Sequence, residues 1–350
     1  RWVIKPQGDP QKVDELATAT GIPRVLANLL VQRGIDTYDE VSRFFSPKLS
    51  DLHDPFLMKD MEKAVRRVDE AVTRGQKIMG YGDYDLDGIT AVALVYIFLR
   101  QMGMEELLFY IPDRYTEGYG ISKLGVDYAK KNGVDLIIAL DCGIKAVEKV
   151  AYANQLGIDF IICDHHLPGE EIPAAVAVLD PKQPGDDYPF DELSGCGVGF
   201  KLVQGYCQYK GIPFESIVGL LDLVVVSTAA DIVPLVGENR ILAHYGLKKL
   251  NEKQSIIKIC GLEGHKITID DIVFKIGPRI NAAGRMAVDR EEDMSAPSGG
   301  HAAVNLLVER NEDLADEFGI FIDSSNQARK SIDRSVTQEA HDYIRSHPEY

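Results

Sequence analysis

The stretch KIMGYGDYDLDG, residues 77–88, decides the fold of this 350-residue chain. Its first part, residues 77–81, is a short apolar run that predicts a buried β-strand. Its second part holds three aspartates at alternate positions and then a glycine: Asp83, Asp85, Asp87 and Gly88. A helical pattern over residues 90–101 follows. A strand, an acidic turn and a helix in this order predict the start of a β-α-β unit in a parallel sheet.

The same alternation continues along the chain. Further apolar runs predict strands at residues 107–111, 136–140, 160–163 and 175–179. Helical patterns flank them at residues 61–74, 123–132, 145–155, 198–209 and 214–230. Short strands that are apolar throughout and separated by helices indicate a sheet buried on both faces. The predicted fold class is therefore α/β, with a mostly parallel sheet flanked by helices.

Three parts of the chain can be separated by their patterns. Residues 1–60 predict an N-terminal helical extension, with short helices at residues 14–21 and 25–34. Residues 61–300 hold the predicted sheet domain and end in a polar stretch that reads as a loop. Residues 301–350 predict one long, charged helix.

Acidic and imidazole groups follow the predicted strands. The third strand runs into Asp141, the fourth into Asp164, His165 and His166, and a later helical run ends in Asp231. Because the carboxyl ends of parallel strands meet at one edge of a sheet, we expect these groups to lie close together. Clustered carboxylates are unfavourable without a cation, and carboxylates with one or two imidazoles suit Mn²⁺ or Mg²⁺. The number of ligands predicts two such ions.

Each motif taken alone has a simpler explanation. The aspartate run imitates the start of a calcium-binding EF-hand loop, but its twelfth position is Leu94 where a bidentate glutamate is needed. Asp141 alone would be typical of a helix cap, and the histidine pair alone of a polar loop. Their joint occurrence at successive strand ends favours a functional site.

These motifs resemble the DHH phosphoesterase superfamily, and within it most closely the RecJ family of single-stranded-DNA-specific 5′→3′ exonucleases. The three motifs are residues 83–88, 141–143 and 164–166. Further segments that resemble RecJ are residues 33–35, 45–47, 111–114, 117–120, 195–202, 230–240 and 278–285. The resemblance runs from about residue 2 to residue 345, with the motifs in the order of the family.

The resemblance implies roles for individual residues. Asp141 would bridge two divalent ions, with Asp83 and Asp85 completing one site and Asp87, His165 and Asp231 the other. His166 would sit beside the scissile phosphate, and Asp164 would support the histidines. The residues that would hold substrate phosphates are Arg114, Arg279, Asn281 and Arg285.

The implied activity is two-metal hydrolysis of phosphodiester bonds, with release of 5′-mononucleotides in DNA repair and recombination. The implied partners are single-stranded DNA with a 5′ end, a single-strand-binding protein and a RecQ-type helicase. Two alternatives stay open: another DHH hydrolase, acting on oligoribonucleotides, cyclic dinucleotides or pyrophosphate, and a non-catalytic DHH scaffold of a replication complex. The presence of every motif carboxylate and both histidines argues against the scaffold.

The family pattern also includes a C-terminal DHHA1 domain with a Gly-Gly-Gly-His motif, and an OB domain. We expect residues 301–350 to lead toward a DHHA1 domain that the 350 residues lack, and a first residue other than Met to mark a trimmed chain or a fragment. Residues 298–301 imitate the DHHA1 motif but precede the long helical stretch, so we predict a loop there. Without that domain we expect weak binding of DNA.

Net charge and cysteine content bear on how the chain would bind DNA and on its cellular compartment. The formal net charge is −16, which is unlike the basic footprint of most DNA-binding proteins. Two divalent ions would bring it to −12, so metals and a few arginines would meet the phosphates. The chain has five cysteines, no C-x-x-C pair, and no run of 18 apolar residues. We expect free thiols, no membrane span and a cytoplasmic protein.

Overall fold

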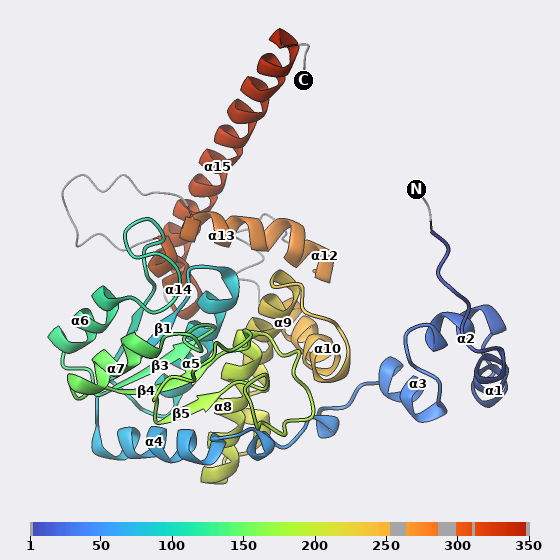
Figure 1. Ribbon diagram of the computed structural model, residues 1–350, viewed down its shortest axis with the longest axis horizontal. Coiled ribbons are helices and arrows are strands. Elements are labelled where there is room, and N and C mark those ends of the chain that lie inside the picture. The colour runs from blue at the N-terminus through green and yellow to red at the C-terminus, as the bar shows by residue number, and fades with distance from the viewer. Residues whose placement is uncertain (1–2, 253–263, 286–298, 310–311, 348–350) are drawn as a thin grey trace.

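A five-stranded parallel sheet lies at the centre of the computed structural model (Figure 1). The structure describes residues 3–252, 264–285, 299–309 and 312–347. The strands are β1 (Ile78–Gly82), β2 (Leu107–Tyr110), β3 (Leu136–Leu140), β4 (Asp159–Cys163) and β5 (Ala177–Leu179), in the order β2-β1-β3-β4-β5. All four pairings are parallel, which confirms the predicted fold class.

The register of the sheet explains where the motifs meet. Gly82 of β1 pairs with Leu140 of β3, and Leu140 pairs with Cys163 of β4. The next residue on each strand is an aspartate, so Asp83, Asp141 and Asp164 leave the sheet at the same level of one edge. Because these pairings are parallel, all three strands point their carboxyl ends in the same direction, and helices cross over between them.

Helices cover both faces of the sheet, as Figure 1 shows. One core contains alternate strand residues such as Ile78, Ile138 and Leu140, and the other contains Met79 and Tyr81. This alternation follows from the two-residue period of a strand. The first face carries α4 (Met61–Arg74), α5 (Leu86–Gln101), α8 (Gly195–Lys210), α9 (Leu221–Ala230) and α10 (Gly237–Glu252), and the second carries α6 (Lys123–Lys131) and α7 (Val147–Gln155).

The N-terminal helices form a small cluster of their own. They are α1 (Pro10–Thr20), α2 (Arg24–Val31) and α3 (Tyr38–Phe45). The helix α3 was not predicted, although Thr37 and Glu40 form a capping box at its start, a signal that the sequence does carry. The cluster contacts α10 through Arg240, whose guanidinium lies 3.5 Å from the ring centroid of Phe44.

The C-terminal part differs from the prediction in two ways. Residues 299–301 are not a loop, because α14 (Gly299–Val308) begins at Gly299. The glycines there allow close packing: a Cβ on Gly299 would lie 1.8 Å from the carbonyl oxygen of Ala283, and one on Gly300 would lie 2.4 Å from the side chain of Ile111. The predicted long helix is α15 (Glu312–Ser346), which is separate from α14.

Smaller elements complete the description. The predicted helix at residues 214–230 is two short 3₁₀ turns, η3 (Phe214–Ser216) and η4 (Val218–Leu220), followed by α9. Before α13 (Gly277–Arg285) lie α12 (Ile269–Asp271) and the π-helical segment η5 (Ile272–Ile276), and short 3₁₀ turns η1 (Leu49–Asp51) and η2 (Pro55–Leu57) precede α4. None of the helices in the described ranges is long and apolar enough to cross a membrane.

Candidate metal centre

The acidic loop after β1 is folded onto the start of α5. The helix begins at Leu86, four residues earlier than predicted, so Asp85 is its N-cap and Asp87 lies in its first turn. One oxygen of Asp85 accepts from the backbone N–H groups of Asp87 at 3.0 Å and Gly88 at 3.3 Å. Gly88 is needed because a Cβ there would lie 2.5 Å from the backbone nitrogen of Asp83.

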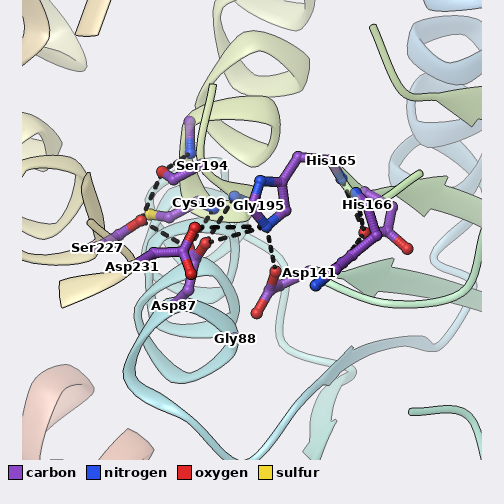
Figure 2. A network of polar contacts seen from close by, with 12 residues as sticks. Asp87, Gly88, Asp141, His165, His166, Ser194, Gly195, Cys196, Ser227 and Asp231 are labelled. Atoms are coloured by element: carbon purple, nitrogen blue, oxygen red, sulfur yellow. Dashed lines mark hydrogen bonds and ion pairs between the residues drawn. The ribbon is translucent and has the colours of Figure 1, made fainter. Parts of the chain in front are cut away.

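Asp87 is held in place by three donors (Figure 2). Its carboxylate accepts from the backbone N–H groups of Gly195 and Cys196, each at 2.7 Å, and from the hydroxyl of Ser227 at 2.6 Å. The two backbone donors belong to the first turn of α8, whose free N–H groups and dipole favour a negative charge. Sequence reasoning placed Gly195 and Cys196 in a family segment but missed this contact and missed Ser227.

Asp141 lies at the centre of the cluster in a left-handed backbone conformation, with φ of 60°. Its side chain is buried, and Oδ1 lies 3.2 Å from Nε2 of His165. The α8 backbone can approach because residue 195 is glycine: a Cβ there would lie 2.5 Å from Oδ1 of Asp141. Burial and the neighbouring charge of Asp87 hold the pKa of Asp141 well above its usual range.

His165 faces three carboxylates. Beyond Asp141, its Nε2 lies 3.7 Å from Oδ2 of Asp87 and 3.7 Å from Oδ2 of Asp231. Burial lowers the pKa of His165, which favours the neutral imidazole that binds metals. The ligand atoms of Asp87, His165 and Asp231 all lie within 4.8 Å of one another, as do those of Asp141, His165 and His166. Two candidate ligand triplets therefore share His165.

Asp231 arrives from the opposite side of the cluster, at the C-cap of α9. Its side chain is 32% exposed, and burial together with Asp87 and Asp85 raises its pKa to about 7. The next residue, Ile232, has a φ of 60° although it is neither glycine nor asparagine. Strain of this kind costs about 1–2 kcal/mol per residue, and it occurs here directly after a candidate ligand.

Asp164 and His166 form a second polar pair beside the cluster. Asp164 accepts from the backbone N–H of Ile144 at 2.9 Å, and its other oxygen lies 2.7 Å from Nδ1 of His166. Burial would raise the pKa of Asp164, but its hydrogen bonds with His166 and Ile144 outweigh burial and lower it. The same pairing raises the pKa of His166. Nε2 of His166 lies 3.2 Å from the hydroxyl of Tyr119, a contact that sequence reasoning did not predict.

The predicted first metal site is only partly assembled. Neither Asp83 nor Asp85 belongs to a three-ligand group in the described ranges. Asp83 is buried, and burial together with Asp85 raises its pKa to about 7. The ligand atoms of His166, Asp141 and His165 lie within 4.8 Å of one another, and the predicted contact of His166 with the phosphate stays a prediction.

The four predicted phosphate-binding residues have different surroundings. Arg114 lies over the ring of Tyr84 at 5.4 Å from its centroid. Arg279 pairs with Asp323 of α15 at 3.3 Å. The side-chain oxygen of Asn281 accepts from the backbone N–H of Leu86 at 2.8 Å, so it fixes the acidic loop. The side chain of Arg285 lies outside the described part of the chain.

Unsatisfied polar atoms are among the features of this cluster that favour a cation site. Oδ1 of Asp83, Oδ1 of Asp141 and Nδ1 of His165 are fully buried and have no well-formed hydrogen bond within the described ranges. A buried polar atom without a partner is unfavourable by about 1–3 kcal/mol, more if it is charged. Hard carboxylate oxygens together with imidazole suit Mn²⁺ or Mg²⁺, so the donor set fits the predicted ions.

Comparison with known proteins agrees with this geometry. Residues 77–228 match the model of the DHH family, N-terminal domain. The chain therefore contains a domain of the DHH family. The DHH motifs, residues 83–88, 141–143 and 164–166, are the segments that supply most of the cluster.

The relatives of this DHH chain include two curated proteins, each named single-stranded-DNA-specific exonuclease RecJ. The one from Bacillus subtilis (strain 168) is 39% identical over 345 residues, which are 97% of this chain and 42% of that protein. The one from Escherichia coli (strain K12) is 33% identical, over 94% of this chain and 57% of that protein. The chain thus spans about half the length of these relatives.

Solved structures of RecJ proteins have a similar fold. The crystal structure of an exonuclease RecJ bound to manganese is 27% identical, with a TM-score of 0.73 over 83% of this chain and 71% of that one. The RecJ of Thermus thermophilus in complex with Mn²⁺ has a TM-score of 0.79 at 24% identity, over 95% of this chain and 46% of that one. At this identity, the second comparison shows a similar fold and nothing further.

Proposed function

We propose that this DHH chain acts as a single-stranded-DNA-specific 5′→3′ exonuclease of the RecJ type. It would hydrolyse phosphodiester bonds and release 5′-mononucleotides, as part of DNA repair and recombination. The observation that supports this most directly is the cluster of ligand atoms of Asp87, Asp141 and Asp231 around His165, in which a buried oxygen of Asp141 has no well-formed hydrogen bond. The RecJ names of the relatives supply the substrate class.

The residues that would hold two divalent ions, Mn²⁺ or Mg²⁺, are the predicted ligands Asp83, Asp85, Asp87, Asp141, His165 and Asp231. When bound, such ions activate a water and stabilise the departing alkoxide. Asp87 contributes a ligand of fixed position, because three donors orient its carboxylate. Asp141, the predicted bridge between the ions, has its Oδ1 3.2 Å from Nε2 of His165, so its carboxylate would set the spacing of the two sites.

His166 would orient the scissile phosphate. Its pairing with Asp164 raises its pKa, which favours the protonated imidazole near neutral pH. A protonated ring can donate a hydrogen bond to a phosphate oxygen or to the leaving oxygen. Asp164, which bonds to the ring of His166 and to backbone N–H groups, would fix the ring in that position.

Arg114 and Arg279 would bind phosphates of the strand, since a guanidinium can contact phosphate with two parallel hydrogen bonds. Nearby, Tyr115 and Tyr119 are 65% and 58% exposed. Exposed aromatic rings beside a phosphate site provide stacking surfaces for unpaired bases, which a duplex does not offer.

Partners and compartment are the remaining parts of the proposal. A single-strand-binding protein and a RecQ-type helicase would present 5′-ended single strands to this enzyme. The cytoplasm is the proposed compartment, and the free buried thiols of Cys142, Cys163, Cys196 and Cys207 fit a reducing environment. The fifth cysteine, Cys260, lies outside the described residues.

The function is tested by cleavage of 5′-phosphorylated single-stranded DNA in Mn²⁺, in Mg²⁺ and in EDTA, with duplex DNA, short RNA and a cyclic dinucleotide in parallel. We expect mononucleotides from single-stranded DNA in the presence of metal. Asp141→Asn should lower the rate about 10³-fold or more, because a displaced ion removes several kcal/mol of transition-state stabilisation. Asparagine tolerates the left-handed backbone of this position.

Two results would contradict the proposal. Activity of Asp141→Asn near that of the parent protein would refute the metal assignment. Preference for short RNA or for the cyclic dinucleotide would assign the chain to another branch of DHH hydrolases.

A further inference from the structure

A cavity of about 260 Å³ lies beside the metal centre, and none of the three DHH motifs lines it. Its lining comes from three elements that are distant in sequence: the end of α9, the segment η5–α13 and the long helix α15. The lining residues are Ala230, Val273, Gly277, Pro278, Asn281, Ala282 and Arg329.

Two lining residues of the cavity are connected to segments that carry candidate metal ligands. Ala230 precedes Asp231 in the chain. Asn281 accepts a hydrogen bond from the backbone N–H of Leu86, which lies between Asp85 and Asp87. Because the oxygen of this amide is occupied, its NH₂ group remains as a donor. A ligand in the cavity would therefore lie next to the reacting centre.

Arg329 supplies the positive charge of the cavity. It is half-buried, and its Nε and Nη2 each lie 3.4 Å from the side-chain oxygen of Asn326, a buried residue of the same helix. Within the described ranges, Arg329 forms no ion pair with a carboxylate. Arg279, by comparison, already pairs with Asp323. Arg329 is thus a positioned guanidinium whose charge is not neutralised by a described neighbour.

The remaining walls are small and mostly apolar: glycine, alanine, proline and valine. Pockets for drug-sized ligands are typically about 300–1,000 Å³, so this one suits a ligand about as large as a single nucleotide unit. One cation, one amide donor and small apolar walls match the phosphate and the sugar of such a unit.

We infer that this cavity is a subsite for one nucleotide of the substrate strand next to the scissile bond, with Arg329 binding its phosphate. This inference rests on the proposed action on nucleic acid. It makes α15 part of the substrate site, since the helix carries the phosphate ligand. It also makes Asn281 a positioning residue that links the subsite to the acidic loop.

The test compares Arg329→Ala and Arg329→Lys with Arg334→Ala, a matched loss of an exposed arginine on the same helix. Binding of a labelled 5′-phosphorylated trithymidylate is measured in EDTA, and KM and kcat for single-stranded DNA are measured in Mn²⁺. Arg329→Ala should raise Kd and KM about tenfold, as expected for a lost charge-assisted hydrogen bond, and change kcat less than about threefold. Arg329→Lys should recover part of the loss, and Arg334→Ala should match the parent.

A second variant fills the cavity without changing charge. Val273→Phe should also raise Kd, and thermal melting of each variant reports whether it folds. Parental Kd and KM in both Arg329→Ala and Val273→Phe would overturn the subsite. If the parent binds the trithymidylate through Arg329 but cleaves no DNA, the subsite stands and the proposed nuclease activity fails. If the parent cleaves DNA but Arg329→Ala behaves as Arg334→Ala, the subsite alone fails.

Discussion

Two buried charged clusters contact the helix α8, and they differ in whether their charges are compensated within the protein. The one in the middle of α8 centres on Lys201, which is fully buried and donates to Oε1 of Glu238 at 2.6 Å. The other oxygen of Glu238 accepts from the hydroxyl of Tyr188 at 2.6 Å. Lys201 also donates to Gln204 and to the carbonyl of His53. In this cluster each charge is neutralised by a neighbouring side chain.

The cluster at the N-terminal end of α8 brings together several carboxylates without a lysine or arginine to neutralise them in the described part of the chain. Asp83, Asp87 and Asp141 are buried close together, and the imidazole among them, His165, has a lowered pKa that disfavours its charged form. In the described part of the chain, one buried oxygen each of Asp83 and Asp141 lacks a well-formed hydrogen bond and is available to a cation. A neutralised cluster holds the fold together, whereas a cluster that lacks an internal counter-charge is suited to bind an ion.

Breaking the neutralised cluster should give the larger loss of stability. In Lys201→Met the carboxylate of Glu238 stays buried without its counter-charge, which should lower the free energy of unfolding by about 3–5 kcal/mol. Denaturant unfolding measures the change. The increase in stability on adding Mn²⁺ should stay as in the parent, because no ligand is altered.

The double variant Lys201→Met with Glu238→Gln is the control, and it should recover part of the loss because the unpaired charge is removed. Parental stability of Lys201→Met would show that the ion pair is not needed. A lost response to Mn²⁺ would show that the two clusters are coupled through α8.

The sequence predicted the acidic cluster far better than the neutralised one. Asp83, Asp141 and Asp164 each follow an apolar run, and parallel pairing then brings them to one edge without further information. The partners Lys201 and Glu238 lie 37 residues apart on two helices, and neither interrupts a pattern in a way that identifies the other. Their contact depends on tertiary packing.

Dependence on tertiary packing also explains why the sequence did not predict some contacts of the metal centre. The hydroxyl of Ser227 and the N–H of Cys196 reach Asp87 only because α8 and α9 pack against α5. The glycines at 299 and 300 resembled loop residues, yet they serve close packing of α14, a need that appears only when the neighbouring backbone is placed.

The acidic cluster should make the metal-free protein sensitive to pH. The pKa values of Asp83 and Asp231 are raised to about 7, above the usual value of 3.8. At these two groups the folded protein therefore holds more protons than the unfolded chain between about pH 4 and pH 7, and their contribution to stability falls as the pH rises through this window. Mn²⁺ should reverse the trend, because it stabilises the ionised carboxylates.

Thermal melting in EDTA from pH 5 to pH 8 measures this effect, with about 2–4 °C expected per kcal/mol. Asp83→Asn should flatten the profile, since the asparagine does not titrate. Lys201→Met, which leaves the acidic cluster intact, is the matched control and should keep the slope. Stability that rises steadily from pH 5 to pH 8 without metal would contradict the assigned pKa shifts.

The smallest expected effect concerns the rim of the acidic cluster, where Tyr119 contacts His166 at 3.2 Å. The contact is partly exposed, so its loss in Tyr119→Phe should be worth about 0.5–1.5 kcal/mol, or about 2–10-fold in kcat. Steady-state kinetics on single-stranded DNA in Mn²⁺ measure the change. If instead the ring serves mainly as a stacking surface, Tyr119→Phe should match the parent and Tyr119→Ala should raise KM.

Tyr115→Phe is the control for this smallest effect, because it removes a hydroxyl from another exposed ring of the same loop. We expect it to change kcat less than Tyr119→Phe does, since the hydroxyl of Tyr119 is the one that lies 3.2 Å from Nε2 of His166. Equal losses of kcat in both variants would point to a general effect of the loop. A loss in Tyr119→Phe alone would show that even the exposed edge of the cluster orients its imidazole through a dedicated partner.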